Sequence, residues 1–236
     1  MTQFGHPHHH HRLTDSTNER ARELVDAGAP AGTVVTAAEQ SAGRGRRGRA
    51  WTAPAGKALL YSAILSPLDA RHLLLPLTVP LAVCEAIESL AAVRCLVKWP
   101  NDVWIDERKV AGVLIEARPP DWAVIGVGVN LTIEADEFPP DLRWPATSVG
   151  RGASPGPATE ALNAALAAWV DAPDEDVLRA YRDRDALRGR RLSWSGSPVP
   201  EGVGVAEGID GRGNLVVRPP HGERIALGSG EVELSL

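Results

Sequence analysis

Residues 95–131 are the part of the chain that most limits how it can fold. They contain four apolar segments of strand length, joined by connections of only a few residues. The segments are residues 95–99, 103–105, 109–116 and 122–131. Because a connection between parallel strands needs about a dozen residues or more, connections this short make neighbouring strands antiparallel. A wholly parallel βαβ sheet is therefore excluded, and we expect a mixed, largely antiparallel sheet.

The rest of the chain predicts helices around this region and a second, smaller unit after it. Apolar periodicity and capping residues predict one helix that begins within residues 15–18 and stops near Gly28. Further expected elements are strands over residues 33–40 and 59–65, helices over 80–92, 158–170 and 174–185, and a loop over 134–157. From about residue 188, short strands separated by turns are typical of a small β-barrel. The predicted fold class is α+β, with one domain over residues 13–187 and a barrel domain over 188–236.

Composition narrows the class of protein. The 236 residues are 44% apolar and 23% charged, and their formal net charge of −5 argues against wholesale nucleic-acid binding. Two cysteines are too few for a disulfide scaffold or a cysteine-rich zinc site. No apolar run reaches the roughly 18 residues of a membrane span, so we expect a cytoplasmic protein. Residues 1–12 include a histidine tract, which can bind metal but which we interpret as a disordered tail.

The most specific motif is the run Gly-Arg-Gly-Arg-Arg-Gly-Arg at residues 43–49. Its glycines satisfy the pattern of a dinucleotide-binding loop, but that motif needs a helix at the loop, and the sequence after Trp51 starts none. Arginines separated by glycines instead suit a backbone that closes around a phosphate or carboxylate. We predict an anion-binding loop that is mobile until an anion neutralises it. A nucleic-acid contact or a plain solvated turn are the alternatives.

Lysine is rare in this chain, and two of its lysines fall in one predicted hairpin. Only Lys57, Lys98 and Lys109 occur among 25 basic residues. Lys98 opens Lys-Trp-Pro-Asn-Asp, and Lys109 opens Lys-Val-Ala-Gly, whose Gly112 permits close approach of a ligand. The segment 126–130, Gly-Val-Gly-Val-Asn, has the same property. These features favour a pocket over an Asn/Asp turn with a flanking lysine or a solvated strand edge.

Taken in order, these motifs resemble those of the biotin protein ligase (biotin–[acetyl-CoA-carboxylase] ligase) family. The matching segments are Ser16-Thr17-Asn18, residues 43–49 with Trp51, residues 98–102, residues 109–112 and residues 126–130. The resemblance covers the chain from residue 13 onward. It implies a class II synthetase-like catalytic domain followed by an SH3-like domain. Because only about twelve residues precede Thr14, the chain resembles members that lack an N-terminal DNA-binding domain.

The resemblance also implies a reaction: biotin and ATP give biotinoyl-5′-AMP and pyrophosphate, and a lysine of a carrier domain then takes the biotinoyl group. It assigns biotin binding to Ser16, Thr17, Asn18, Gln40, Arg44, Gly45, Arg46, Lys109 and Gly112. It assigns ATP binding to Arg44, Arg46, Trp51, Lys98, Asn101, Asp102 and Asn130. Trp51 would stack on the adenine, and Mg²⁺ would accompany ATP near Asp102. Lys109 and Arg44 would be catalytic, because positive charge must gather where negative charge develops.

The expected partner is the biotin carboxyl carrier domain of acetyl-CoA carboxylase, with no DNA, no membrane and a possible homodimer. Two other functions stay open at this point. A lipoate ligase or octanoyltransferase would have a similar fold, and a reactive Cys95 would support the transferase because cysteine can carry an acyl group without ATP. An RNA-binding module would use the arginine loop and show strongly salt-dependent binding.

Overall fold

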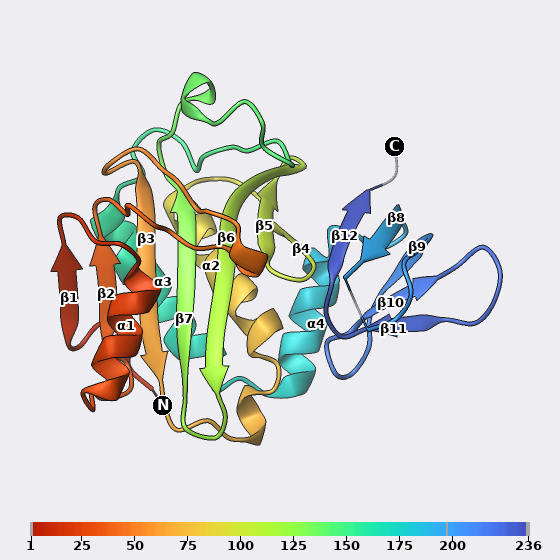
Figure 1. The fold of residues 1–236 in the computed structure, drawn as a ribbon, viewed down its shortest axis with the longest axis horizontal. Coiled ribbons are helices and arrows are strands. Elements are labelled where there is room, and N and C mark those ends of the chain that lie inside the picture. The colour runs from red at the N-terminus through yellow and green to blue at the C-terminus, as the bar shows by residue number, and fades with distance from the viewer. Residues whose placement is uncertain (1, 197, 235–236) are drawn as a thin grey trace.

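Two β-sheets organise the chain in the computed structural model, which describes residues 2–196 and 198–234 (Figure 1). The larger sheet has seven strands in the order β1-β2-β3-β7-β6-β5-β4. Its strands are β1 His8–His11, β2 Val34–Ala37, β3 Ala58–Leu65, β4 Leu96–Lys98, β5 Asp102–Ile105, β6 Arg108–Arg118 and β7 Trp122–Asn130. β1 and β2 are parallel, and the other pairs are antiparallel. The predicted mixed, largely antiparallel sheet is confirmed.

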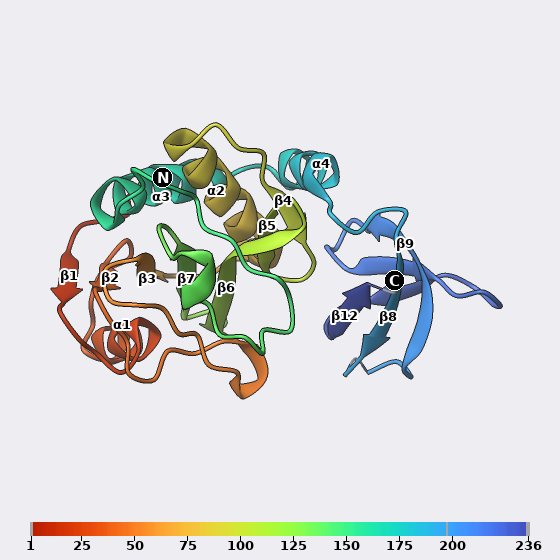
Figure 2. The same cartoon turned by 90° about the horizontal axis from the view of Figure 1, so that it is seen from above.

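Helices cover both faces of this sheet (Figure 2). α1 Thr17–Asp26 packs on one face, against β2, β3 and β7, and α2 Leu75–Leu90 with α3 Pro155–Trp169 covers the other. β3 lies between these layers, so all eight of its residues are buried. α4 Asp174–Arg184 packs against α2 beside the second sheet. Within the described residues, no helix combines the length and apolar character needed to cross a bilayer.

Prolines explain why two helices begin earlier than predicted. α2 was expected from residue 80 and α3 from residue 158, but they begin at Leu75 and Pro155. Proline suits the first turn of a helix, where its missing N–H has no intrahelical partner to lose. Pro76 and Pro155 occupy such positions, and Pro80 is accommodated inside α2. The proline-rich stretch before residue 80 therefore starts the helix that we had placed after it.

The histidine tract is not a disordered tail, so that prediction is wrong. Residues His8–His11 form β1 and pair in register with Val34–Ala37 of β2. Upstream, Phe4 is buried at 7% exposure, and the Gly5 N–H donates to the Gly32 carbonyl at 2.9 Å. Buried Phe4 and backbone hydrogen bonds hold β1 in place. The polar side chains of this segment gave no reason to predict that it would be ordered.

The C-terminal sheet is antiparallel, with the order β11-β10-β9-β8-β12. Its strands are β8 Arg191–Ser195, β9 Gly202–Ile209, β10 Leu215–Arg218, β11 Ile225–Leu227 and β12 Glu231–Leu234. The five predicted strands are confirmed, and among the described residues β11 and β12 do not pair with each other, so the sheet is not closed. Turn residues specify which strands form hairpins, but not whether the two edges meet. The domain boundary at residue 187/188 stays a prediction.

Candidate active site

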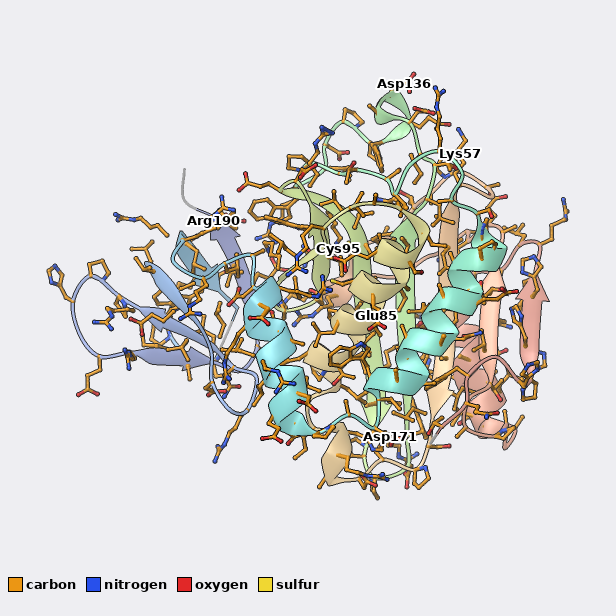
Figure 3. The ribbon with its side chains drawn as sticks, turned by 180° about the vertical axis from the view of Figure 1, so that it is seen from behind. Lys57, Glu85, Cys95, Asp136, Asp171 and Arg190 are labelled. Atoms are coloured by element: carbon orange, nitrogen blue, oxygen red, sulfur yellow. The ribbon has the colours of Figure 1, made fainter. Side chains whose placement is uncertain are left out.

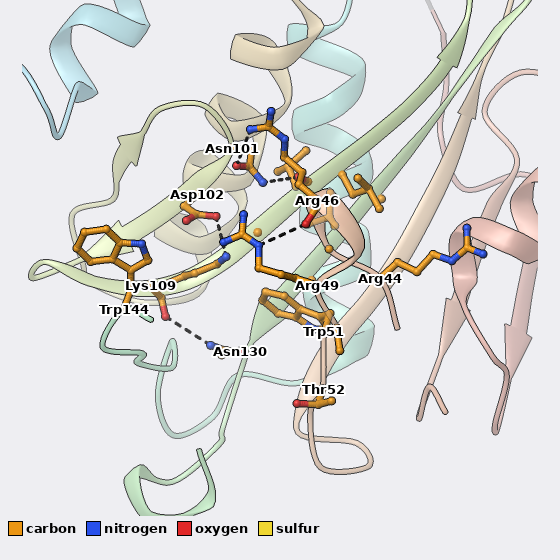
Figure 4. Close-up of a pocket in the computed structure, with 18 of the residues that line it drawn as sticks. Arg44, Arg46, Arg49, Trp51, Thr52, Asn101, Asp102, Lys109, Asn130 and Trp144 are labelled. Atoms are coloured by element: carbon orange, nitrogen blue, oxygen red, sulfur yellow. Dashed lines mark hydrogen bonds and ion pairs between the residues drawn. The ribbon is translucent and has the colours of Figure 1, made fainter. Parts of the chain in front are cut away.

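One pocket is lined by all the site residues predicted from the sequence, although they are spread from Ser16 to Asn130. Its floor is formed by β6 and β7, and its sides come from the start of α1, the arginine segment 43–49 and the loop before α3 (Figure 4). The C-terminal sheet closes the pocket with Glu231 and Val232 of β12. Both parts of the chain therefore contribute to one site.

A buried polar cluster forms one end of the pocket. Gln40 Oε1 accepts hydrogen bonds from the backbone N–H of Thr17 at 2.7 Å and from its hydroxyl at 3.1 Å. Ser62 Oγ lies 2.8 Å from Thr17 Oγ1 and 2.6 Å from Asn18 Oδ1. Asn18 Nδ2 donates to Glu116 at 2.8 Å. Thr17 and Asn18 are each only 4% exposed, so this end offers fixed donors and acceptors to a small polar ring.

An ion pair occupies the centre of the pocket. Lys109 Nζ lies 2.7 Å from Asp102 Oδ1, and its ammonium is 5.5 Å from the centre of the Trp51 ring. The hairpin of β5 and β6 makes this pairing, because Asp102 is opposite Gly112 in the register. Gly112 leaves room for the lysine: a Cβ there would lie 3.2 Å from Lys109 Nζ. Asp102 therefore fixes the position of the Lys109 ammonium in the pocket.

The second lysine of the pocket, at the end of β4, lies beside two tryptophans that contact each other. Lys98 Nζ is 4.7 Å from the centre of the Trp144 ring and 5.8 Å from that of Trp104. The lysine is 4% exposed, and this burial lowers its pKa to about 8, with Asp102 opposing the shift. Backbone pairing places Trp144, since the Lys109 N–H donates to the Pro145 carbonyl at 2.8 Å. Lys98 is a desolvated cation that can titrate near neutral pH.

The arginines of the loop point in different directions (Figure 4). Arg44 pairs with Glu19 of α1 at 3.1 Å, away from Lys109, although it lines the pocket. Arg46 Nη1 donates to Asn101 Oδ1 at 3.3 Å, and burial lowers the pKa of this guanidinium. Arg49 is paired with Glu231 of the C-terminal sheet. The pairing of Arg46 and Asn101 joins the loop to Lys-Trp-Pro-Asn-Asp.

The remaining predicted residues shape the pocket through backbone contacts. Asn130 Nδ2 donates to the Thr147 carbonyl at 3.0 Å and lies 3.5 Å from the Lys109 carbonyl. Gly45 closes the arginine turn by donating its N–H to the Arg49 carbonyl at 2.7 Å. Ser16 is the N-cap residue of α1 and is 4% exposed.

Four lining or supporting residues were not predicted from the sequence. Ser62, Glu116, Trp144 and Glu231 carry contacts described above, but none belongs to a local motif. Ser62 lies inside an apolar strand, and its polarity at a fully buried position is the one signal that could have found it. Glu231 also accepts from Arg143 of the loop before α3, and so joins that loop to the arginine segment. Such contacts depend on the fold and are invisible in the sequence.

Cys95 and Lys57, which were discussed from the sequence, do not line the pocket. Figure 3 labels both residues. Cys95 is fully buried beside Cys84, whose pKa is raised by its contact with Cys95 and by burial. A thiol without access to the pocket cannot serve as the acyl carrier of a transferase. Lys57 forms an ion pair at 2.6 Å with Glu137, which follows Asp136 in the loop after β7 (Figure 3).

The pocket lacks the donor set of a resident magnesium site. Within residues 2–196 and 198–234, no three histidine, cysteine or acidic side chains gather as possible ligands. Asp102 is already paired with Lys109 at 2.7 Å. Mg²⁺ near Asp102 therefore stays a prediction, and the ion would arrive with ATP, held mainly by phosphate oxygens.

Comparison with known families agrees with this geometry. The model of the biotin/lipoate A/B protein ligase family matches residues 11–130. The model described as biotin protein ligase C terminal domain matches residues 200–235. The chain belongs to the biotin/lipoate A/B protein ligase family.

Within that family the chain is similar to biotin ligases. The biotin–[acetyl-CoA-carboxylase] ligase of Paracoccus denitrificans is 34% identical over 231 residues, which cover 90% of this chain and 94% of that protein. The biotin protein ligase of Aquifex aeolicus in complex with biotin and ATP superposes with a TM-score of 0.80 at 26% identity, over 97% of this chain and 99% of that one. The bifunctional ligase/repressor of Bacillus spizizenii is 36% identical, but the match spans only 45% of its length.

Proposed function

We propose that the chain is a biotin protein ligase, which activates biotin with ATP and transfers it to a lysine of a biotin carboxyl carrier domain of acetyl-CoA carboxylase. The observation that carries the proposal is the joining, in one pocket, of a buried polar end at Thr17, Asn18 and Gln40 to a cationic centre at Lys98 and Lys109. Biotin has a polar ring and a carboxylate tail, so its ring can bind at the polar end of the pocket. Its carboxylate then lies at the two lysines, where it meets the phosphates of ATP.

In the first step, a carboxylate oxygen of biotin bonds to the α-phosphorus of ATP, and the bond from that phosphorus to the bridging oxygen breaks. Pyrophosphate leaves with the electron pair. Negative charge concentrates on the α-phosphoryl oxygens, and the Lys109 ammonium, fixed by Asp102, is placed to stabilise it. Arg46 and Lys98 neutralise the phosphates on either side.

In the second step, the acceptor lysine attacks the acyl carbon of biotinoyl-5′-AMP as a neutral amine. The bond from that carbon to the phosphate oxygen breaks, AMP leaves with the electrons, and the amine loses its proton to solvent. The mixed anhydride is already reactive toward amines, so positioning is the main task of the protein here.

The lowered pKa of Lys98 predicts a pH dependence. In the free enzyme the Lys98 ammonium is present below about pH 8 and is lost as the pH rises through that value. Since kcat/KM follows ionisations of the free enzyme, kcat/KM for ATP should fall about tenfold per unit above pH 8. The check is a pH profile of initial rates at low ATP. Lys98→Arg keeps its charge at every pH, so an inflection near pH 8 that persists in this variant would assign it to another group.

The two half-buried tryptophans of the pocket are alternative adenine platforms. Trp51 rests on the glycine floor, because a Cβ at Gly128 would lie 2.3 Å from its ring, whereas Trp144 flanks Lys98. Stacking a base on an aromatic ring contributes about 1–3 kcal/mol. We expect Trp144→Ala to raise the KM for ATP about tenfold with little change in the KM for biotin. If Trp51→Ala has that selective effect instead, the adenine lies on Trp51, as the family resemblance implies.

A groove next to the pocket offers a surface for the acceptor. It shares Arg46, Pro100, Asn101, Val113 and Leu114 with the pocket and continues past the start of α2 to the turn between β9 and β10. Its other lining residues include Leu73, Leu74, Pro76, Leu77, Trp99, Ile115 and Arg212. Apolar side chains flanked by two arginines suit a protein segment with apolar and acidic residues.

Leu73 tests this groove because it is 75% exposed, so its replacement cannot empty the core. We expect Leu73→Ser to raise the KM for a carrier domain about fivefold and to leave biotin-dependent ATP–pyrophosphate exchange unchanged. Leu13→Ser is the matched control, since Leu13 is 53% exposed and lines neither the groove nor the pocket. Equal effects of both changes would place the acceptor elsewhere.

The decisive test of the proposed function is ATP–pyrophosphate exchange with biotin, lipoate or octanoate as the sole added acid. Exchange with biotin alone is the expected result. Exchange with lipoate would identify the chain as a lipoate ligase of the same family. If no acid supports exchange, RNA binding by the arginine loop becomes the favoured function. A homodimer, cytoplasmic location and the lack of DNA binding stay predictions for sedimentation, localisation and binding measurements.

A further inference from the structure

The histidine strand β1 has no part in the proposed reaction. It lies at the edge of the large sheet, and His8, His9 and His10 are exposed. Because side chains alternate along a strand, His8 and His10 share one face, and His9 and His11 share the other. Four consecutive histidines therefore form two pairs with separate surroundings.

The two rings of the first pair converge on one atom. His8 Nε2 is 2.8 Å, and His10 Nδ1 2.9 Å, from Oγ1 of Thr36 on the neighbouring strand. Because both nitrogens contact the same oxygen atom, the distance between them cannot exceed the sum of these two distances. Thr36 is 5% exposed and fixed within β2, so it holds both rings toward a common point. No corresponding convergence is recorded for His9 and His11 among the described contacts.

The donor atoms of this pair suit a transition-metal ion. A neutral imidazole keeps a nitrogen lone pair, which is the form that binds metal. The paired residues of β1 and β2 include no lysine, so no ammonium group on these strand residues repels a bound cation.

We propose that His8 and His10 form a binding site for a divalent transition metal such as Ni²⁺, Cu²⁺ or Zn²⁺, with water in the other positions. Imidazole is a preferred ligand of these ions. No third histidine, cysteine or acidic group completes a cluster within the described residues, so the ion would exchange readily. Thr36 of β2 holds both rings toward one point, so the ion should bind the docked strand more tightly than the unfolded tract and stabilise the docked state.

The test is calorimetric titration of the full chain with Ni²⁺ in three forms. The double variant His8→Gln/His10→Gln removes the converging pair, and His9→Gln/His11→Gln is the matched control with the same number of histidines. We expect the first to weaken Ni²⁺ binding at least tenfold and the second less than threefold. Equal weakening, stronger weakening in the control, or no binding to the unaltered chain would overturn the proposal.

Thermal unfolding gives an independent readout. Ni²⁺ should raise the Tm of the unaltered chain and of the control variant, and a chelator should reverse the rise. The Tm of His8→Gln/His10→Gln should not respond to the metal, while its value without metal shows whether the variant is folded. A metal response that survives in this variant would also contradict the site.

Discussion

Lys109→Met is expected to lower the rate of biotin-dependent ATP–pyrophosphate exchange about a thousandfold, because removing one preorganised charge at a developing anion has effects of about that size. Lys109 is paired with Asp102 at 2.7 Å, and it lies in the pocket beside Trp51. Methionine matches the lysine side chain up to Cε and lacks only the charged amine. The measurement is the exchange rate at saturating biotin and ATP, with the Tm of each variant as the check on folding.

Loss of the lysine also leaves Asp102, which is 9% exposed, without its cation. An unpaired buried carboxylate destabilises a fold, so the Tm should fall. The double variant Lys109→Met/Asp102→Asn removes both charges and should recover stability but not activity. Lys57→Met is the control for losing a lysine, since Lys57 lies outside the pocket. If the double variant regains activity as well as stability, the role of Lys109 is structural and not catalytic.

Gly126→Ala is expected to raise the KM for biotin about a hundredfold. A Cβ at this position would lie 2.2 Å from Asn18 Oδ1, a distance that the two atoms cannot share. Asn18 is held by Ser62 and Glu116, so it can move only by breaking these hydrogen bonds. A displaced Asn18 no longer presents its amide to biotin, and losing two hydrogen bonds to the ligand at about 1–1.5 kcal/mol each corresponds to an effect of this size. Steady-state kinetics with biotin varied would measure it.

The same kinetics should show less than a threefold change in the KM for ATP, because the lysines and Asp102 are not displaced. Gly156→Ala is the matched substitution, since a Cβ at Gly156 meets nothing within 4 Å. It should leave both KM values unchanged. A biotin KM that stays low in Gly126→Ala would remove Asn18 from the biotin site.

The residues that could be predicted from the sequence are those whose position is set by local structure. Lys98, Asp102 and Lys109 lie on the neighbouring strands β4, β5 and β6, so the short connections that predict antiparallel strands also bring these charges together. The arginine segment could be placed near them only through the family resemblance. Its contact between Arg46 and Asn101 joins parts of the chain that no local pattern connects.

Contacts between distant segments set the limit of prediction. β1 pairs with a strand some 26 residues further along, and its parallel register leaves no hairpin signal. Trp144 reaches the pocket because its loop pairs with the backbone at Lys109, inside a region without periodic pattern. Glu231 reaches Arg49 only once the second sheet has docked. In each case the determinant is the approach of two folded parts.

The scarcity of lysine has a consequence for an enzyme with the proposed chemistry. Biotinoyl-5′-AMP acylates any accessible amine, and a ligase holding it is the nearest protein that it could label. Lys98 is buried beside two tryptophans, Lys109 is paired with Asp102, and Lys57 is paired with Glu137. Arginine carries the remaining fixed positive charge and does not react as an amine. Few side chains of this chain can therefore react with biotinoyl-5′-AMP. This favours transfer of biotin to the acceptor over labelling of the ligase itself.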